Sequence, residues 1–313
     1  MPCKLSNINK KPRKFTLSNT TSLTSAKYAM FRTAGLIGVG LIGGSLGLAM
    51  KSGGLVERVI GFGRTQKNLD QAKQIGAIDE VVELATLCAQ SDLIILSVPV
   101  AQTQAMLEQI LPHLREQTVV IDVGSTKSDV IASAKAALGE RVNQFVACHP
   151  IAGGAQHGAL AARKDLFVDR QVMICPIPEN RLDFISVIEE FWHRLGSLIF
   201  KMSALEHDHI FATVSHLPHL LSYALMLQVA NADDADKKFT HAGAGFKDFT
   251  RIAASSPEMW CDITLANRTA ILQELDTYLQ IVSHLKESIV AEDRVTLEQL
   301  FTLASISRNR WQA

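Results

Sequence analysis

The sequence predicts an α/β protein in which a doubly wound parallel sheet is followed by an all-helical domain. From Thr33 to about Met202, short apolar runs alternate with segments of helical spacing, as buried parallel strands alternate with their crossover helices. Beyond Met202 the short apolar runs stop and only helical spacing continues. We therefore expect a first domain over residues 30–202 and a second over residues 203–313.

Seven apolar runs are the expected strands of the first domain, all of them parallel and buried. In chain order they are AGLIG, RVIGFG, DLIILSVP, TVVIDVG, QFVACHP, QVMICP and SLIFKM. In the second domain, helical spacing covers 204–231, 257–292 and 294–310. The apolar content of these segments is high for so few helices, which indicates that some helix faces are buried in a partner subunit.

The composition is that of an ordinary globular protein long enough for two cores: 313 residues, of which 47% are hydrophobic and 20% charged. No apolar run is expected to reach the length of a membrane span. The net charge is zero, but residues 1–35 contain seven Lys or Arg and no acid, which leaves the remainder mildly acidic. Nothing in that balance favours a nucleic acid partner.

Residues 1–29 are rich in Lys, Ser, Thr and Asn and lack apolar periodicity, so we expect a disordered leader there. They lack the apolar stretch of a secretory signal, and either a transit peptide or a start codon upstream of Met30 explains them. The five cysteines are scattered without the spacing of a zinc site or a disulfide framework. Reduced thiols, a cytoplasmic location and no bound metal are therefore expected.

Residues 35–45, GLIGVGLIGGS, place three glycines between an expected strand and an expected helix. The first permits a tight turn, the second lets the backbone approach a pyrophosphate, and the third lets the helix pack against the strand. The phosphates of a dinucleotide would then meet the amide-rich start of the helix. The cofactor-binding residues expected in this turn, and in the turn SVP at the end of a later strand, are Gly38, Gly40, Leu41, Ile42, Gly43, Ser97 and Pro99.

The end of the second strand indicates which nicotinamide cofactor fits. An NAD site usually carries Asp or Glu there, but this chain has Gly63 followed by Arg64 and Thr65. A cation and a hydroxyl suit a 2'-phosphate and offer it no repulsion, although a solvated basic turn would have the same residues. We expect NADP as the cofactor, with NAD as the alternative.

His149 ends the strand QFVACHP and precedes a glycine-containing turn, so it is expected at the carboxyl edge of the sheet beside the nicotinamide. An imidazole in that place is suited to act as a base. Cys148 is expected to point to the opposite face and to pack in the core. Ser125, on the turn after the preceding strand, is expected either to hydrogen-bond the imidazole or to cap a helix.

The second domain contains four histidines close together, at 207, 209, 216 and 219, without the spacing of a metal site. Pro218 is expected to disturb the helix around them, and one or two polar side chains are expected to face the cleft. In GAGFKDFTRIA, Lys247 and Arg251 lie four residues apart and so share one helical face. This cationic pair either suits a substrate with carboxylates or forms an exposed basic stripe.

Taken in order, GVGLIGGS, DVGSTK, HPIAGG, VSHLPH, and GFKDFTRIA followed by PEMWCDI make the chain similar to the prephenate and arogenate dehydrogenase family of tyrosine biosynthesis. The resemblance covers the chain from about Phe31 to the end. It implies a Rossmann-type dinucleotide-binding domain, a helical dimerisation domain and hence a homodimer. It also implies hydride transfer from C4 of the substrate ring to a nicotinamide, while the ring carboxylate leaves as carbon dioxide.

The resemblance further implies roles for individual residues. His149 matches the family's base for the C4 hydroxyl, and Ser125 matches the serine that orients this base. Arg251 matches an arginine that grips a substrate carboxylate. His216 and Lys247 match further substrate contacts, and the lysine can come from the partner subunit.

Two positions depart from the family pattern: many relatives carry Glu where this chain has Ala155, and often an acid where it has Leu160. An acid would hold the amino group of arogenate, whereas the keto group of prephenate needs none. We therefore expect prephenate as the substrate, with arogenate as a second substrate or, alternatively, the only one. The competing interpretations are another NADP-dependent oxidoreductase, of the 3-hydroxyacid dehydrogenase or imine reductase type, and a non-catalytic dinucleotide sensor.

Overall fold

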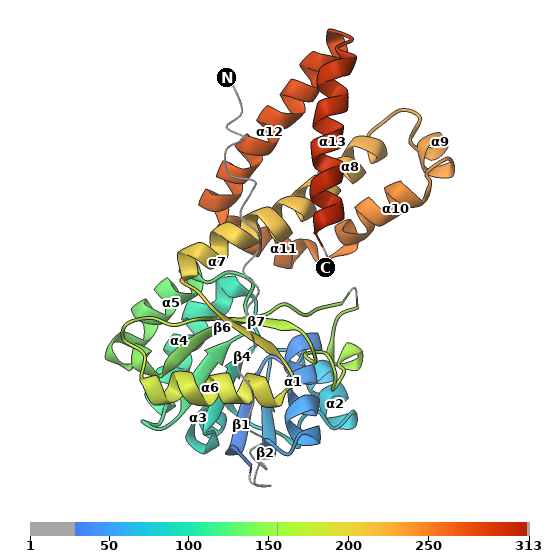
Figure 1. The fold of residues 1–313 in the computed structure, drawn as a ribbon. Coiled ribbons are helices and arrows are strands. Elements are labelled where there is room, and N and C mark those ends of the chain that lie inside the picture. The colour runs from blue at the N-terminus through green and yellow to red at the C-terminus, as the bar shows by residue number, and fades with distance from the viewer. Residues whose placement is uncertain (1–28, 155, 312–313) are drawn as a thin grey trace.

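The computed structural model describes residues 29–154 and 156–311, which form a sheet domain followed by a helical domain (Figure 1). The expected leader lies outside these residues except for Ala29. In the described chain, eight strands form one sheet in the order β3-β2-β1-β4-β5-β6-β7-β8. They are β1 (Phe31–Ile37), β2 (Val56–Phe62), β3 (Glu80–Val81), β4 (Leu93–Leu96), β5 (Val119–Asp122), β6 (Phe145–Pro150), β7 (Gln171–Cys175) and β8 (Leu198–Lys201). The first six run parallel, so the Rossmann-type architecture is confirmed.

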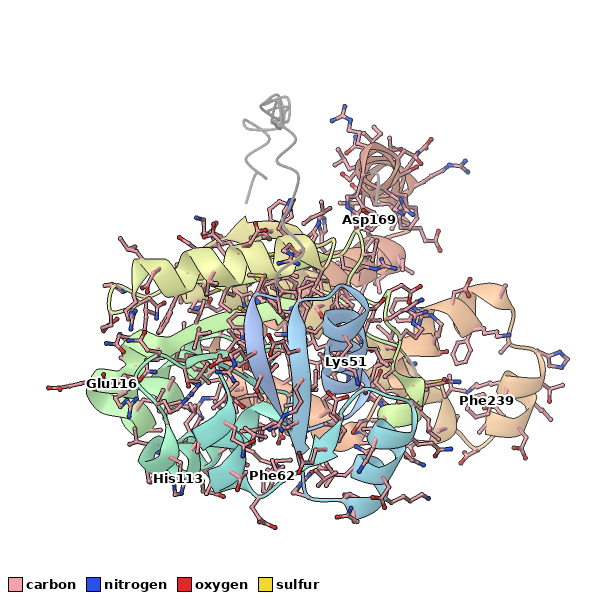
Figure 2. The ribbon with its side chains drawn as sticks, turned by 90° about the horizontal axis from the view of Figure 1, so that it is seen from below. Lys51, Phe62, His113, Glu116, Asp169 and Phe239 are labelled. Carbon is pink, nitrogen blue, oxygen red and sulfur yellow. The ribbon has the colours of Figure 1, made fainter. Side chains whose placement is uncertain are left out.

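Helices cover both faces of the sheet. They are α1 (Leu41–Ser52), α2 (Gln66–Gln74), α3 (Leu84–Gln90), α4 (Thr103–Ile110), α5 (Ser128–Leu138) and α6 (Leu182–Arg194). The apolar faces of α1, α2 and α6 pack in one buried cluster, and those of α3, α4 and α5 pack in another. In Figure 2, seen from below, the yellow α6 and the teal α3 and α4 accordingly lie on opposite sides of the strands. Burial on both faces explains why these strands are continuous apolar runs.

The last two strands correct the expectation that every strand is parallel and buried. β7 pairs antiparallel with β6, and β8 pairs parallel with β7. Among its described residues, the segment between β6 and β7 contains a short 3-10 turn (Ala159–Ala161) and no helix that would carry the chain back to the other end of the sheet. The chain therefore re-enters the sheet at the same end at which β6 left it, and β7 runs in the opposite direction to β6. β8 closes the sheet as an edge strand, and Leu198 and Phe200 on it are exposed.

The helical domain begins two residues after β8. Its helices are α7 (Ala204–Phe211), α8 (Leu217–Ala230), α9 (Ala235–Thr240), α10 (Ala244–Thr250), α11 (Pro257–Ala266), α12 (Arg268–Val290) and α13 (Arg294–Arg310). The expected helix over 257–292 is interrupted at Asn267, which ends α11 and precedes α12. A π-turn (Ala212–His216) joins α7 to α8 just before Pro218, so the helix is disturbed where the proline predicted it. The α12–α13 hairpin extends away from the sheet domain (Figure 1).

The segment Ala204–Ala230, which contains α7, the π-turn and α8, also corrects the expectation about membrane-length segments. By length and composition alone it is apolar enough to cross a membrane. Of its most apolar stretch of 18 residues, 28% is buried within the described chain. Its buried polar side chains include His207, Asp208 and His216, and they make hydrogen bonds to the sheet domain or within the helical domain. Ionisable groups at such positions are costly in hydrocarbon. The helix is thus built to dock on the sheet, and α7 contacts α5 and β7.

Candidate active site

The glycine-rich turn after β1 has the shape that a dinucleotide needs. Gly38 has a φ of +91°, and a Cβ atom added there would lie 2.3 Å from the carbonyl oxygen of Ser97. A Cβ atom on Gly43 would lie 2.1 Å from the carbonyl oxygen of Gly38. Both positions therefore require glycine. A Cβ atom on Gly40, in contrast, would meet nothing within 4 Å, which leaves open space for a ligand beside the backbone.

The start of α1 faces this open space with unmatched amide groups. Gly40 is the N-cap residue, no side chain caps the helix, and its first turn, which begins with Leu41 and Ile42, holds no acid. Such a helix start favours an anion. The amide of Ser97 donates to the carbonyl oxygen of Ile37 at 2.8 Å, which places the turn after β4 alongside. Pro99 follows on the same turn. These residues fit the pyrophosphate of a nicotinamide dinucleotide.

Beyond β2 the chain presents basic and hydroxyl side chains. Arg64 and Thr65 are exposed, and among the described residues Arg64 makes no ion pair. Thr65 is the N-cap residue of α2, but its hydroxyl makes no capping hydrogen bond. Asn68, one turn later, donates to the carbonyl oxygen of Val39 at 3.2 Å and accepts from the amide of Ala159 at 2.9 Å. Asn68 thus connects the segment after β6 to the glycine-rich turn through hydrogen bonds.

His149 lies near the end of β6, half-buried, and its closest polar neighbour comes from the helical domain. Its Nδ1 is 2.8 Å from Nε2 of His207, and its ring packs against Phe211 with the two centroids 5.1 Å apart. Burial, together with the nearby His207, Lys127 and His216, holds the pKa of His149 well below its ordinary value. The imidazole is therefore neutral near pH 7 and able to accept a proton.

Ser125 lies half-buried on the turn after β5, but no hydrogen bond between it and His149 is found among the described residues. Its orienting role stays a prediction. The turn itself is held by Asp122, which accepts hydrogen bonds from the amides of Gly124 at 2.8 Å and Cys148 at 3.0 Å and pairs with buried Lys127. Cys148 is fully buried, and this burial raises the pKa of its thiol, so it packs in the core as expected.

His216 ends the π-turn and is 1% exposed. The amide nitrogen of Asn267 lies 2.7 Å from the carbonyl oxygen of Asp208, which identifies it as a donor, and 3.1 Å from Nδ1 of His216. Nδ1 therefore accepts a hydrogen bond, and the proton of the neutral ring is on Nε2. Burial lowers the pKa of His216 to about 4. Its Nε2 is buried without a partner among the described residues, which makes it a donor available to a ligand.

A cavity of about 230 Å³ lies between the two domains, lined by Gly153, Gly154, His219, Arg251, Ile252, Ala254 and Ser255. The ring of His219 stacks on Trp260 with the centroids 3.6 Å apart. Arg251 begins a 3-10 turn after α10 and brings a guanidinium group to this cavity. Lys247 lies exposed on α10 and is not among the lining residues, so its role as a substrate contact stays a prediction.

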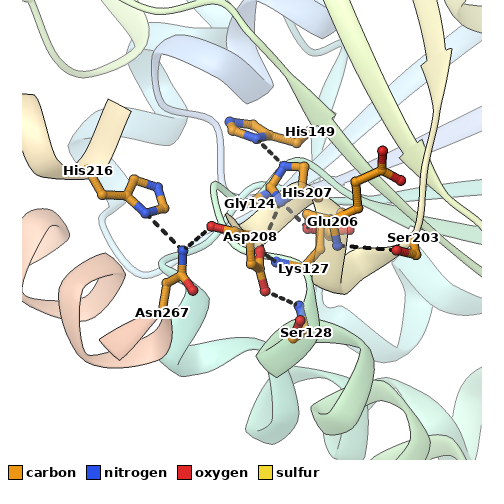
Figure 3. Close-up of polar contacts among 11 residues, drawn as sticks. Gly124, Lys127, Ser128, His149, Ser203, Glu206, His207, Asp208, His216 and Asn267 are labelled. Atoms are coloured by element: carbon orange, nitrogen blue, oxygen red, sulfur yellow. Dashed lines mark hydrogen bonds and ion pairs between the residues drawn. The ribbon is translucent and has the colours of Figure 1, made fainter. Parts of the chain in front are cut away.

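Sequence reasoning missed the polar residues that connect these histidines. Figure 3 shows His149, His207 and Asp208 in one chain of contacts, and His216 joined through Asn267 to Asp208. The sequence places these histidines of the helical domain close together, but their partners come from segments far apart in the sequence. One signal was present: an acid adjoining a histidine in a strongly apolar helix needs a buried partner.

A glycine-rich turn and a neutral histidine at the same edge of a doubly wound sheet fit an NAD(P)-dependent dehydrogenase. The family model described as the nucleotide-binding domain of prephenate dehydrogenase matches residues 46–201, and that of its dimerization domain matches residues 203–303. The chain belongs to the prephenate dehydrogenase family and is an NAD(P)-dependent dehydrogenase.

Individual relatives agree with this assignment. A cyclohexadienyl dehydrogenase of Zymomonas mobilis is 31% identical over 267 residues, which are 84% of this chain and 90% of that protein. A prephenate dehydrogenase of Bacillus subtilis is 32% identical over 279 residues, which are 88% of this chain and 74% of that protein. The crystal structure of Aquifex aeolicus prephenate dehydrogenase with hydroxyphenyl propionate and NAD+ superposes with a TM-score of 0.84 at 30% identity, covering 89% of this chain and 98% of that one.

Proposed function

We propose that this dehydrogenase converts prephenate to 4-hydroxyphenylpyruvate with NADP, and that His149 is its catalytic base. The observation that carries the proposal is the neutral imidazole of His149, half-buried at the carboxyl edge of the sheet where the nicotinamide of a doubly wound fold binds. A base must be unprotonated at the working pH, and burial gives His149 that property.

The reaction needs a hydride acceptor, a proton acceptor and a clamp for the substrate's carboxylates. When bound, the nicotinamide accepts the hydride from C4 of the substrate ring. His149 takes the proton of the C4 hydroxyl, so that this carbon becomes a carbonyl carbon as the hydride departs. Loss of the ring carboxylate as carbon dioxide returns an electron pair to the ring, which becomes aromatic. The phenolate oxygen then recovers the proton from His149, and the base is regenerated.

Arg251 and His216 are proposed to hold the substrate. The guanidinium group of Arg251 lines the cavity between the domains and suits bidentate binding of a carboxylate. The Nε2 proton of His216 supplies a further donor, because Asn267 occupies the other ring nitrogen. Lys247 is proposed as an additional contact, and Ser125 as the residue that orients His149.

Prephenate is proposed over arogenate because the described residues around Arg251 offer no acid to an amino group. Among the described residues, no carboxylate lines the cavity that contains Arg251. Leu160, where relatives often carry an acid, is 61% exposed on the segment after β6. Ala155, the other departure, lies outside the described residues. Arogenate remains the second candidate substrate, since an acid elsewhere in the site would serve the same purpose.

NADP is proposed over NAD because none of the three residues directly after β2 is an acid. Two of them, Arg64 and Thr65, are exposed and suited to bind a 2'-phosphate. A homodimer is proposed because the helical domain matches a dimerization domain and leaves large apolar side chains exposed. A cytoplasmic location is proposed from the scattered cysteines, and the four within the described residues form no disulfide.

The test is the initial rate of cofactor reduction with the purified chain, in which prephenate and arogenate are each combined with NAD and with NADP. Turnover of prephenate with a preference for NADP is the expected result. Turnover of arogenate alone would contradict the substrate proposal and would leave the family assignment intact. Turnover of prephenate with NAD alone would contradict the role proposed for Arg64.

A further inference from the structure

The helix that enters the helical domain carries two buried groups that reach back to His149. His207 and Asp208 are consecutive residues of α7 and are 0% and 4% exposed. Nε2 of His207 is 2.8 Å from Nδ1 of His149, and Nδ1 of His207 is 2.9 Å from Oδ1 of Asp208. The three side chains thus form a linear chain of two hydrogen bonds that crosses from one domain to the other (Figure 3).

The far end of this chain is a carboxylate fixed at the start of a helix. Asp208 accepts hydrogen bonds from the backbone amides of Lys127 and Ser128, each at 2.8 Å, where α5 begins. Burial raises the pKa of Asp208, but hydrogen bonds from His207, Ser128 and these amides outweigh burial and hold it below the ordinary value. The positive end of the helix dipole favours the same ionised state. Asp208 is therefore an acceptor only.

The position of each proton in the chain follows from that end. Because Asp208 is an acceptor, the proton between it and His207 belongs to Nδ1 of His207. Burial lowers the pKa of His207 despite the nearby carboxylate, so the ring is neutral and its Nε2 has a lone pair. The proton between the two imidazoles then belongs to Nδ1 of His149, and Nε2 of His149 is left bare.

We propose that His207 and Asp208 are positioning residues that hold His149 in the tautomer with a proton on Nδ1 and a lone pair on Nε2, the form able to accept the substrate's hydroxyl proton. The proposal rests on the proposed function of His149 as the base. It also means that the base, on β6, is made competent only by the docking of α7 against the sheet domain. When His149 gains its proton, the same two hydrogen bonds connect the new cation to the Asp208 carboxylate.

His216, a second histidine near the site, is held in the opposite tautomer to the one proposed for His149. Asn267 donates to Nδ1 of His216, which puts the proton of that ring on Nε2. His207 presents an acceptor to Nδ1 of His149, which leaves Nε2 bare. One buried histidine is therefore prepared as a donor and the other as a base, by partners of opposite hydrogen-bonding character.

The first experiment compares two substitutions of His207 with a matched control. His207→Gln keeps an oxygen that can accept from His149 and an amide that can donate to Asp208, whereas His207→Leu keeps neither. We expect His207→Leu to lower kcat by about 100-fold with little change in KM for prephenate, and His207→Gln to stay within about tenfold of the unmodified enzyme. The control His209→Leu, an exposed histidine on the same helix, is expected to leave kcat unchanged.

The second experiment observes the tautomer without relying on turnover. With histidines labelled by 15N, the nitrogen chemical shifts of the intact enzyme at pH 7 report which nitrogen of each ring carries the proton, and His149→Asn identifies the signals of His149. We expect His149 to be protonated on Nδ1 in the unmodified enzyme and in His207→Gln, and to shift toward protonation on Nε2 in His207→Leu.

Protonation of His149 on Nε2 in the unmodified enzyme would overturn the proposal, whatever the variants do. Equal kcat values for the Leu and Gln variants would also overturn it, because a merely structural role for His207 does not distinguish an accepting side chain from an apolar one. Failure of the chain to turn over prephenate at all would count against the proposed function, but it would leave the tautomer measurement standing.

Discussion

The two domains differ in how completely each buries its own apolar surface. Both clusters of buried apolar side chains consist of residues between Phe31 and Leu195, in the sheet domain. Of the twenty-four large apolar side chains that the described residues leave exposed, nineteen lie between Leu205 and Trp311, in the helical domain. The sheet domain thus buries most of its own apolar surface, whereas the helical domain leaves many apolar side chains exposed, as expected if the proposed second copy of the chain covers them.

Because of this difference, substitutions in the two domains are expected to have different effects. The groups proposed to act in the reaction lie at the junction: His149 comes from the sheet domain, and His207, His216 and Arg251 come from the helical domain. A substitution confined to the sheet domain should change chemistry or cofactor choice and leave assembly intact. A substitution on the exposed helices should change assembly first. Each of the following predictions tests that division.

The largest effect is expected for His149→Asn, in the sheet domain. Asparagine can keep one hydrogen bond but cannot accept a proton, so we expect kcat to fall by about 10³-fold. Cofactor affinity, measured by fluorescence titration, and the mass in solution should both stay unchanged. A nearly normal kcat in this variant would show that His149 is not the base. A variant that no longer dimerised would contradict the division of roles between the two domains.

The next effect concerns how folding stability changes as the pH falls. It involves His216, which is buried at the end of the π-turn between α7 and α8. Its pKa is about 4 in the folded protein and near 6.5 when unfolded, so the unfolded chain binds the additional proton as pH falls between these values. Folding stability is therefore full above pH 6.5 and is lost toward pH 4, by about 3 kcal/mol from this residue. His149 and His207 act in the same direction, since burial lowers their pKa values as well.

Urea unfolding of the enzyme and of His216→Gln, at several pH values and one protein concentration, measures this contribution. The variant should be less stable than the unmodified enzyme at pH 7, because it loses a buried contact, but its stability should decline less between pH 6.5 and 4. Parallel declines in the two proteins would mean that His216 titrates normally in the folded state.

The exposed face of the helical domain is tested by Phe301→Asp on α13, where the aromatic side chain is 59% exposed. If this face is an interface between copies, a buried charge there should cost about 2 kcal/mol of association, about a 30-fold rise in the dimer dissociation constant. The matched control is Leu182→Asp on α6, where the side chain is 79% exposed in the sheet domain. Sedimentation that shows both variants equally dimeric would place the interface elsewhere.

The sequence predicted the sheet domain better than the helical one for a physical reason. The glycines of the turn after β1 and the buried strands are determined by local geometry and periodicity, which a single chain displays. The reversal of β7 was missed because direction in a sheet depends on the length and course of a connection, and buried strands look alike in either direction. The contacts of His149 with His207 and of His216 with Asn267 join segments more than fifty residues apart, which periodicity cannot pair.

The smallest effect is expected for Arg64→Asp, at the end of β2. An acid there would repel a 2'-phosphate and could accept hydrogen bonds from the ribose hydroxyls of NAD, so kcat/KM with NADP should fall about tenfold and that with NAD should rise. The matched control is Lys73→Ala, an exposed cation in the last turn of α2, which should leave the ratio unchanged. Because Arg64 belongs wholly to the sheet domain, neither variant should alter the mass in solution or KM for prephenate. A cofactor ratio that both variants change equally would mean that α2 attracts the cofactor through its general positive charge, with no specific role for the residue that follows β2.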